Sequence, residues 1–133
     1  MKKAEWERYL RQAEHTLASA KRDSEEGDYD WACFKAHQAA ELVLKGWIRS
    51  SDQFIVGHSI IKLLEHLQQQ FTIPEKIHKC ARELDKVYIP SRYPDIYNAG
   101  APMDFYDLED AQQSLSCVED IFAFTRGLAK DER

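Results

Sequence analysis

Apolar residues recur along this chain at alternating spacings of three and four, which is the period of one face of an α-helix. The first such run consists of Trp6, Leu10, Ala13, Leu17 and Ala20. It predicts an amphipathic helix over about residues 3–25 that ends before Gly27. This periodicity, repeated along the chain, restricts the fold more than any other feature of the sequence.

Two further runs predict a second and a third helix. The second helix begins near Asp28, and its apolar positions are Cys33, Ala36, Ala40, Val43 and Trp47. The third follows Gly57, and its apolar positions are Ile60, Leu64, Leu67 and Phe71. A loop at Ser50–Asp52 separates them, because three short polar residues in a row interrupt the helical pattern.

The fourth and fifth helices are predicted from start signals as well as from periodicity. Thr72 and Glu75 match a capping box with Pro74 in the first turn, so a helix is expected to begin there. Its inward positions are Ile77, Cys80, Leu84 and Tyr88. Asp104 is expected to cap the last helix, whose apolar positions are Leu108, Ala111, Leu115, Val118 and Phe122.

The chain therefore predicts an all-α, up-and-down bundle of four or five helices, forming one domain over residues 1–133. No segment alternates with period two for long enough to indicate a sheet. The one long connection, from Ile89 to Met103, is rich in proline. Tyr93, Ile96 and Tyr97 predict that it is ordered, because leaving so much apolar surface in water is unfavourable.

Charge and cysteine content exclude several classes of protein. The formal net charge of −5 argues against a domain that coats nucleic acid through a general positive field. The three cysteines are an odd number without a C-x-x-C motif, which favours a reducing cytoplasm over a disulfide framework. No apolar stretch is long enough to span a membrane, so no membrane association is expected.

The usual catalytic and cofactor motifs are not recognisable in the chain. Cys33 and His37 are four apart, a spacing that suits two metal ligands, but no second pair completes a site. There is no G-x-S-x-G elbow and no glycine-rich phosphate loop. Helix-end electrostatics explain the acidic residues Asp104, Asp107, Glu109 and Asp110 without catalysis. We expect neither a metal nor a cofactor.

The segment Tyr88–Asp95, which reads YIPSRYPD, is the strongest candidate for function. Its two prolines restrict the backbone around Arg92 and Tyr93, which lowers the entropy lost when a ligand binds. Arginine has a planar donor fork suited to phosphate, and tyrosine has a face suited to stacking on a base. The alternative is a structural loop in which Arg92 pairs with Asp95 and the tyrosines pack.

Read together with the second helix, these residues resemble the HEPN family (higher eukaryotes and prokaryotes nucleotide-binding). The matching segments include Asp28-Tyr29, AHQAAE followed by Leu44-Lys45, Gly57-His58-Ser59 and SRYPD, with Tyr106 and Ala111 near the end. The resemblance implies a helical bundle that forms a homodimer. It also implies a minimal nucleotidyltransferase as partner, in a toxin–antitoxin-like pair.

The resemblance also points to ribonuclease activity, because many members of that family are metal-independent ribonucleases. Their motif is an Arg followed after four to six residues by a His. Arg92 occupies the arginine position, but every histidine of the chain precedes it. We therefore expect a protein that binds a nucleotide or short RNA, or a nucleotidyltransferase, without catalysis. The alternative is an endoribonuclease at a dimer cleft that uses Arg92 with Tyr97 or Tyr93 as the proton carrier.

The residues predicted to contact the ligand come from the loop and from two other segments. Arg92 is assigned to phosphate, and Tyr93 and Tyr88 to stacking or to the shape of the pocket. The remaining predicted contacts are Asp95, Lys45 and His58.

Overall fold

Five α-helices make up most of residues 1–131, which are the residues described by the computed structural model. They are α1 (Lys3–Glu25), α2 (Tyr29–Arg49), α3 (Ile60–Leu67), α4 (Glu75–Val87) and α5 (Leu108–Asp131). Two single 3-10 turns, Pro94–Ile96 and Pro102–Asp104, lie between α4 and α5. No strand occurs in these residues, which confirms the predicted all-α bundle.

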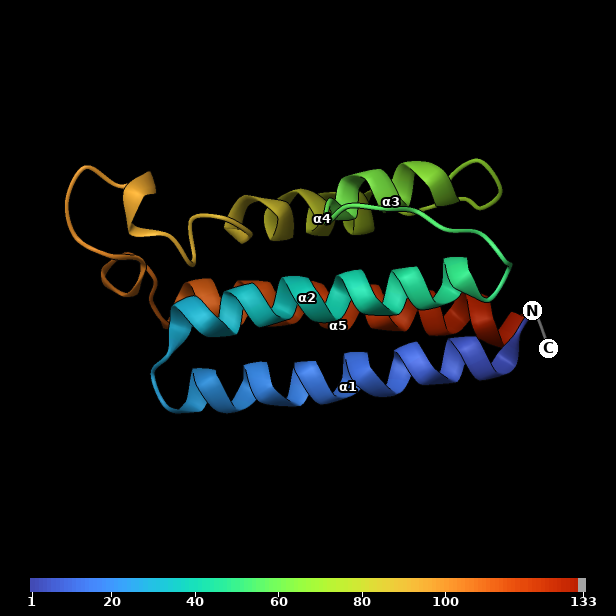
Figure 1. Ribbon diagram of the computed structural model, residues 1–133, viewed down its shortest axis with the longest axis horizontal. Helices are drawn as coiled ribbons and strands as arrows, with labels where there is room; N and C mark the ends of the chain where they lie inside the picture. Colours follow the sequence, from blue (N-terminus) through green and yellow to red (C-terminus); the bar gives the residue numbers. More distant parts are fainter. Residues whose placement is uncertain (132–133) are drawn as a thin grey trace.

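Helix α2 occupies the centre of the bundle and packs against all four other helices. Figure 1 shows α1 on one side of α2 and α5, and the shorter α3 and α4 on the other. The connection from α4 to α5 projects at the end of the bundle opposite the N-terminus. The long connection predicted from its prolines therefore extends past one end of the bundle, and its second 3-10 turn contacts α2.

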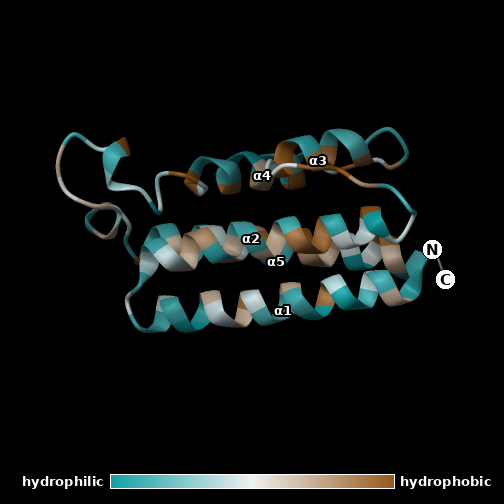
Figure 2. Cartoon of the chain, in the orientation of Figure 1, coloured by the Kyte–Doolittle hydropathy of each residue, from teal (hydrophilic) through white to brown (hydrophobic). Residues whose placement is uncertain are grey.

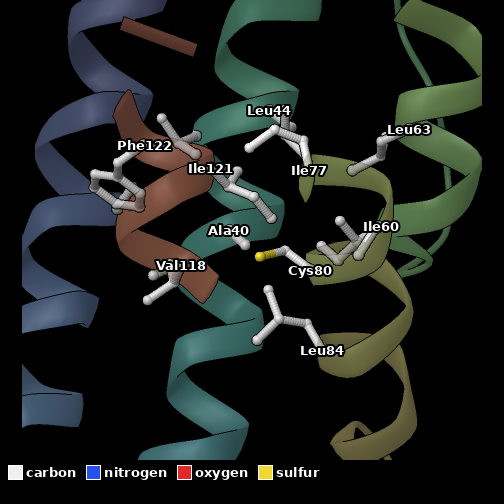
Figure 3. Packing of buried hydrophobic residues seen from close by; sticks show 14 of the residues in the cluster. Ala40, Leu44, Ile60, Leu63, Ile77, Cys80, Leu84, Val118, Ile121 and Phe122 are labelled. Carbon is white, nitrogen blue, oxygen red and sulfur yellow. The ribbon is translucent and has the colours of Figure 1, made fainter. Parts of the chain in front are cut away.

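The hydrophobic core is formed where α2, α4 and α5 meet, with α3 closing one side. Figure 3 shows Leu44 of α2, Cys80 of α4 and Ile121 of α5 directed toward one another, and each is at most 5% exposed. By contrast, α1 is largely hydrophilic (Figure 2) and contributes a narrow buried stripe of Trp6, Ala13, Leu17 and Ala20. This difference explains why α1 has only one packed face, whereas α2 is buried on several sides.

Gly46 allows α1 and α2 to approach closely near one end of the bundle. A Cβ atom at this position would lie 2.4 Å from Cβ of Tyr9 in α1. Trp6 and Trp47 meet edge to face in the same region, with ring centroids 6.0 Å apart. The glycine is therefore needed for helix packing, although glycine is otherwise unfavourable inside a helix.

Both predicted helix caps were wrong in position. Helix α4 begins at Glu75 after Pro74, and no side chain caps it, since the amide of Ile77 donates to the carbonyl of Pro74 instead. Helix α5 begins at Leu108, four residues after Asp104, because Pro102 places Asp104 in a separate 3-10 turn.

The start of α5 is capped by a different pair of acids. The amide of Asp110 donates to the Asp107 carboxylate over 2.9 Å, and the amide of Asp107 donates to the Asp110 carboxylate over 3.0 Å. This reciprocal arrangement is a capping box with Asp in both positions. Capping therefore accounts for Asp107 and Asp110, whereas the prediction had attributed these acids to the helix dipole and had included Asp104, which lies in the separate 3-10 turn.

Helix α3 is shorter than predicted, since it ends at Leu67 and Phe71 lies beyond it. The amide of Phe71 still donates to the carbonyl of Leu67, so the chain turns once more outside the helix. The Phe71 ring lies 6.1 Å from that of Trp47. Phe71 therefore reaches the core from a turn, which is why its spacing resembled a continued helix.

None of the helices described within residues 1–131 has the length and apolar character needed to cross a membrane.

Candidate functional site

Arg92 is held by aromatic rings immediately after α4. Its Nε donates to the backbone carbonyl of Tyr88 over 3.0 Å. The guanidinium carbon lies 4.2 Å from the ring centroid of Phe34, 4.5 Å from that of Tyr88 and 4.8 Å from that of Tyr93. Cation–π attraction to three rings fixes this side chain without an acidic partner among the residues that the structure describes.

Within residues 1–131, no carboxylate forms an ion pair with Arg92. The alternative in which Arg92 pairs with Asp95 is therefore wrong, and Asp95 is exposed on the turn that follows. Nη1 of Arg92 donates to the Tyr93 hydroxyl over 3.2 Å. An arginine oriented in this way can still bind an oxyanion, since it has five N–H donors.

Tyr88 lies at the centre of this aromatic cluster. Its ring centroid is 4.6 Å from that of His37, 5.3 Å from that of His58 and 5.9 Å from that of Phe34. These neighbours surround the ring and fix its orientation. Two exposed rings lie at the edge of this cluster: Tyr93, at 45% exposure beside Arg92, and Trp31, at 46% exposure and 6.1 Å from the ring of Phe34.

Asp85 joins α4 to both α2 and α3. Its carboxylate accepts from the amides of Ile60 and Ile61 over 2.9 and 3.0 Å, and from the Ser59 hydroxyl over 3.0 Å. It also accepts from Nε2 of buried His37 over 3.0 Å. Burial alone would raise the pKa of Asp85, but these hydrogen bonds outweigh it and hold the pKa below its usual value.

Glu41 connects the predicted contacts Lys45 and His58. One carboxylate oxygen accepts from the Lys45 ammonium over 2.9 Å, and the other accepts from Nδ1 of His58 over 3.0 Å. Arg92 and its aromatic neighbours Phe34, Tyr88 and Tyr93 form what we call the Arg92 cluster. Since His58 also stacks on Tyr88, Glu41 fixes one edge of this cluster. Lys45 reaches that cluster only through Glu41, and it lines a separate cavity described below.

The connection that carries Arg92 is ordered by its own aromatic contacts, as its composition predicted. The rings of Tyr97 and Phe105 stack with centroids 4.2 Å apart and planes 5° from parallel. The Tyr97 hydroxyl donates to the carbonyl of Pro90 over 2.8 Å. This bond directs the Tyr97 hydroxyl to the backbone. The tyrosine hydroxyl that accepts a hydrogen bond from Arg92 is that of Tyr93.

Cys33 and His37, the pair at metal-ligand spacing, make other contacts. Burial raises the pKa of the Cys33 thiol to about 11, although a hydrogen bond with Ser114 opposes that rise. His37 is directed toward Asp85 instead. No group of three or more residues suited to a metal occurs in the part of the chain that the structure describes.

Several residues of the site had no predicted role. Phe34, His37 and Glu41 lie at helical spacing on the same face of α2 as Lys45, so their periodicity could have indicated a shared surface. Asp85 gave no such signal, because its partners lie 24 to 48 residues away in the sequence.

Comparison with known proteins identifies the family of this chain. The family model of the HEPN domain matches residues 6–128. The chain belongs to the HEPN domain family. This assignment confirms the resemblance that the α2 segment and the SRYPD segment suggested.

Solved structures of other proteins have the same fold. The chain is 40% identical to TT1696 from Thermus thermophilus, with a TM-score of 0.89, covering 96% of this chain and 98% of that one. It is 36% identical to ST0689, an archaeal HEPN homologue, with a TM-score of 0.78, covering 92% and 96%.

A HEPN domain protein from Thermotoga maritima, tm0613, is 32% identical to the chain. Its TM-score is 0.76, and the match covers 92% of this chain and 98% of that one. The shared fold therefore extends over nearly the whole length of each of these three structures. No curated protein matches the chain.

Proposed function

We propose that this HEPN protein binds a nucleotide or the end of a short RNA, with Arg92 on the phosphate and Tyr93 stacked on the base. The observation that carries the proposal is the orientation of Arg92 by three aromatic rings, without an acidic partner in residues 1–131. Because the side chain is already ordered, little further entropy is lost on binding.

The net charge of the chain supports a small anionic ligand over a long nucleic acid. The molecule carries a formal charge of −5, and Arg92 is a local cation on an acidic body. Long nucleic acids bind mainly through many phosphate contacts, which need an extended basic surface. A single arginine beside exposed aromatic rings suits one or two nucleotides.

Calorimetric titration with ATP, GTP and a short RNA tests this proposal. We expect Arg92→Ala to weaken binding at least tenfold, as loss of a charged hydrogen bond would. Arg82→Ala is the matched control, since Arg82 is an exposed arginine of α4 that pairs with Glu75 at 3.0 Å. The proposal fails if none of the three ligands binds below millimolar concentration, or if both variants weaken binding equally.

The oligomeric state and the partner form a second part of the proposal. Apolar side chains around the Arg92 loop are well exposed: Ile89 at 46%, Ile96 at 52% and Phe105 at 51%. Burial of this surface would stabilise a homodimer or a complex with a nucleotidyltransferase in a toxin–antitoxin-like pair. Sedimentation at tens of micromolar measures the mass of the protein, alone and with a co-expressed nucleotidyltransferase. A homodimer or a complex would sediment as a larger species, and a species of 15.5 kDa in both samples would contradict this part of the proposal.

A second candidate function is a metal-independent endoribonuclease. It is favoured by His58, whose side chain is 56% exposed and whose ring stacks on Tyr88 beside Arg92. An accessible imidazole can transfer a proton as a general acid or base. This activity would be established by RNA cleavage that proceeds in the presence of a chelator and is lost in both Arg92→Ala and His58→Ala. A Tyr93→Phe variant tests whether the phenol is the proton carrier.

A further inference from the structure

A separate cavity of about 300 Å³ opens between α1, α2 and the α2–α3 connection. Its walls are Tyr9 of α1, Lys45, Ile48 and Arg49 of α2, and residues Phe54–Gly57 of the connection. A volume of this size is at the lower end of the range for small-molecule sites. Three different segments build the cavity, so its shape depends on the fold and not on one helix.

The floor and the rim of this cavity are apolar. Ile48 is buried at 2% exposure, and Ile55 packs against the hydrophobic core. Phe54 and Val56 stand at the rim with 67% and 77% exposure. An apolar molecule that entered would cover both of these side chains, which water now contacts.

Two cations stand on the wall of the cavity, and its lining contains no acidic residue from positions 1–131. The side chains of Lys45 and Arg49, one helical turn apart, are 21% and 35% exposed. Glu41 accepts one hydrogen bond from the Lys45 ammonium over 2.9 Å, and that group has three donors. Arg49 Nη2 lies 3.8 Å from Glu5, so the guanidinium keeps donors for another acceptor.

Arg49 also fixes the aromatic part of the rim. Its guanidinium carbon lies 5.5 Å from the ring centroid of Phe54, and Tyr9 belongs to the same lining. The combination of two rings, an apolar floor and two cations complements a flat apolar molecule with one negative group.

A larger hollow elsewhere does not have these properties. The hollow of about 450 Å³ beside Arg8, Arg11, Gln12 and His15 is lined by side chains of α1 alone. It is a surface feature of one helix without an apolar floor, and it supports no comparable argument.

We propose that the cavity between α1, α2 and residues 54–57 binds a small aromatic carboxylate, with its ring against Phe54 and Ile55 and its carboxylate on Arg49 and Lys45. This site is distinct from the Arg92 cluster and does not depend on nucleotide binding there.

A matched pair of probes tests the role of charge at this site. We would titrate the ¹⁵N-labelled protein with 2-naphthoate and with 2-naphthamide, which have the same ring system but differ in charge, and follow the backbone amides by NMR. Saturable shifts are expected at residues 54–57. The naphthoate should bind about tenfold more tightly than the amide, which corresponds to one or two partly buried charged hydrogen bonds.

Four variants separate the parts of the proposed site. Arg49→Met should bring the two affinities within about threefold of each other, because it removes the charge and keeps an apolar stem. Phe54→Ala should weaken both probes. Met103→Ala, an exposed apolar residue of the α4–α5 connection, and Arg92→Ala should change neither.

The proposal is overturned by shifts centred outside residues 54–57, by equal affinity of the two probes for the unmodified protein, or by no saturation at millimolar probe. Because Arg92→Ala serves as a control, failure of this site and failure of the nucleotide site give different results. Thermal unfolding of each variant, followed by circular dichroism, shows that the fold is retained.

Discussion

The Asp85 carboxylate of α4 accepts a hydrogen bond from Nε2 of His37 in α2, 3.0 Å away across the bundle. The same carboxylate accepts from the first amides of α3 at Ile60 and Ile61. One side chain thus joins three helices. It also orients the imidazole that lies beneath Tyr88, and Tyr88 in turn contacts Arg92.

We expect Asp85→Asn to lower the free energy of unfolding by about 2 kcal/mol near neutral pH, because an amide cannot accept all of these hydrogen bonds. The pKa of Asp85 in the folded state lies below its ordinary value of 3.8, so its ionised form stabilises the fold above about pH 4. The difference from the unmodified protein should shrink as the pH falls toward the lowered pKa.

Urea unfolding at several pH values measures this effect. Asp95→Asn is the matched control, since Asp95 is exposed, and it should change stability by less than about 0.5 kcal/mol. Equal effects of the two substitutions would contradict the role assigned to Asp85.

Gly46→Ala should destabilise the protein by about 2 kcal/mol or more, because the new Cβ would lie 2.4 Å from Cβ of Tyr9 and force α1 away from α2. Gly127→Ala in α5 is the control, since within residues 1–131 no heavy atom apart from its own helix backbone and its two chain neighbours lies within 4 Å of a Cβ at that position. It should leave stability unchanged or raise it by up to about 1 kcal/mol. Calorimetric melting of both variants checks the opposite signs.

The three cysteines should react slowly with iodoacetamide in the native protein, because all are buried. Burial also raises the pKa of Cys33 to about 11 and that of Cys117 to about 12, so little thiolate forms at pH 8. Mass spectrometry of alkylated peptides, in buffer and in denaturant, measures the rates. Rapid native labelling of Cys33 would show that α2 and α5 separate readily.

Asp107→Ala should destabilise the protein by about 1 kcal/mol, since it removes the carboxylate that caps Asp110 at the start of α5. Glu109→Ala removes the same charge from the same turn without removing a cap. It should cost only a few tenths of a kcal/mol through the helix dipole. Chemical unfolding that shows no difference between the two would exclude the cap.

The five helices could be predicted because their apolar periodicity is a local property of the sequence. Helix starts were less predictable where two signals competed: Thr72 and Asp104 had the residue types of a cap, but the prolines near them placed the helix start elsewhere. The backbone geometry set by a proline outweighed the preference of a side chain.

The candidate site was predictable only in part, for a related reason. The loop residues Arg92 and Tyr93 are adjacent in sequence, so they could be predicted together as ligand contacts. Their contacts with Phe34, and those of Asp85 with His37, depend on how α4 returns against α2. Such long-range pairs leave no periodic signal in one sequence.

The central position of α2 also determines where this protein can change most easily. Substitutions on α2 fall on the core, on the aromatic support of Arg92 or on the cavity beside Lys45 and Arg49, because different residues of this helix contribute to each. The connection between α4 and α5, which carries Arg92 and Tyr93, projects at one end of the bundle (Figure 1), and no residue of 88–107 belongs to the buried hydrophobic cluster. Divergence of ligand preference, in nature or by directed evolution, should therefore accumulate in that connection while α2 stays constrained.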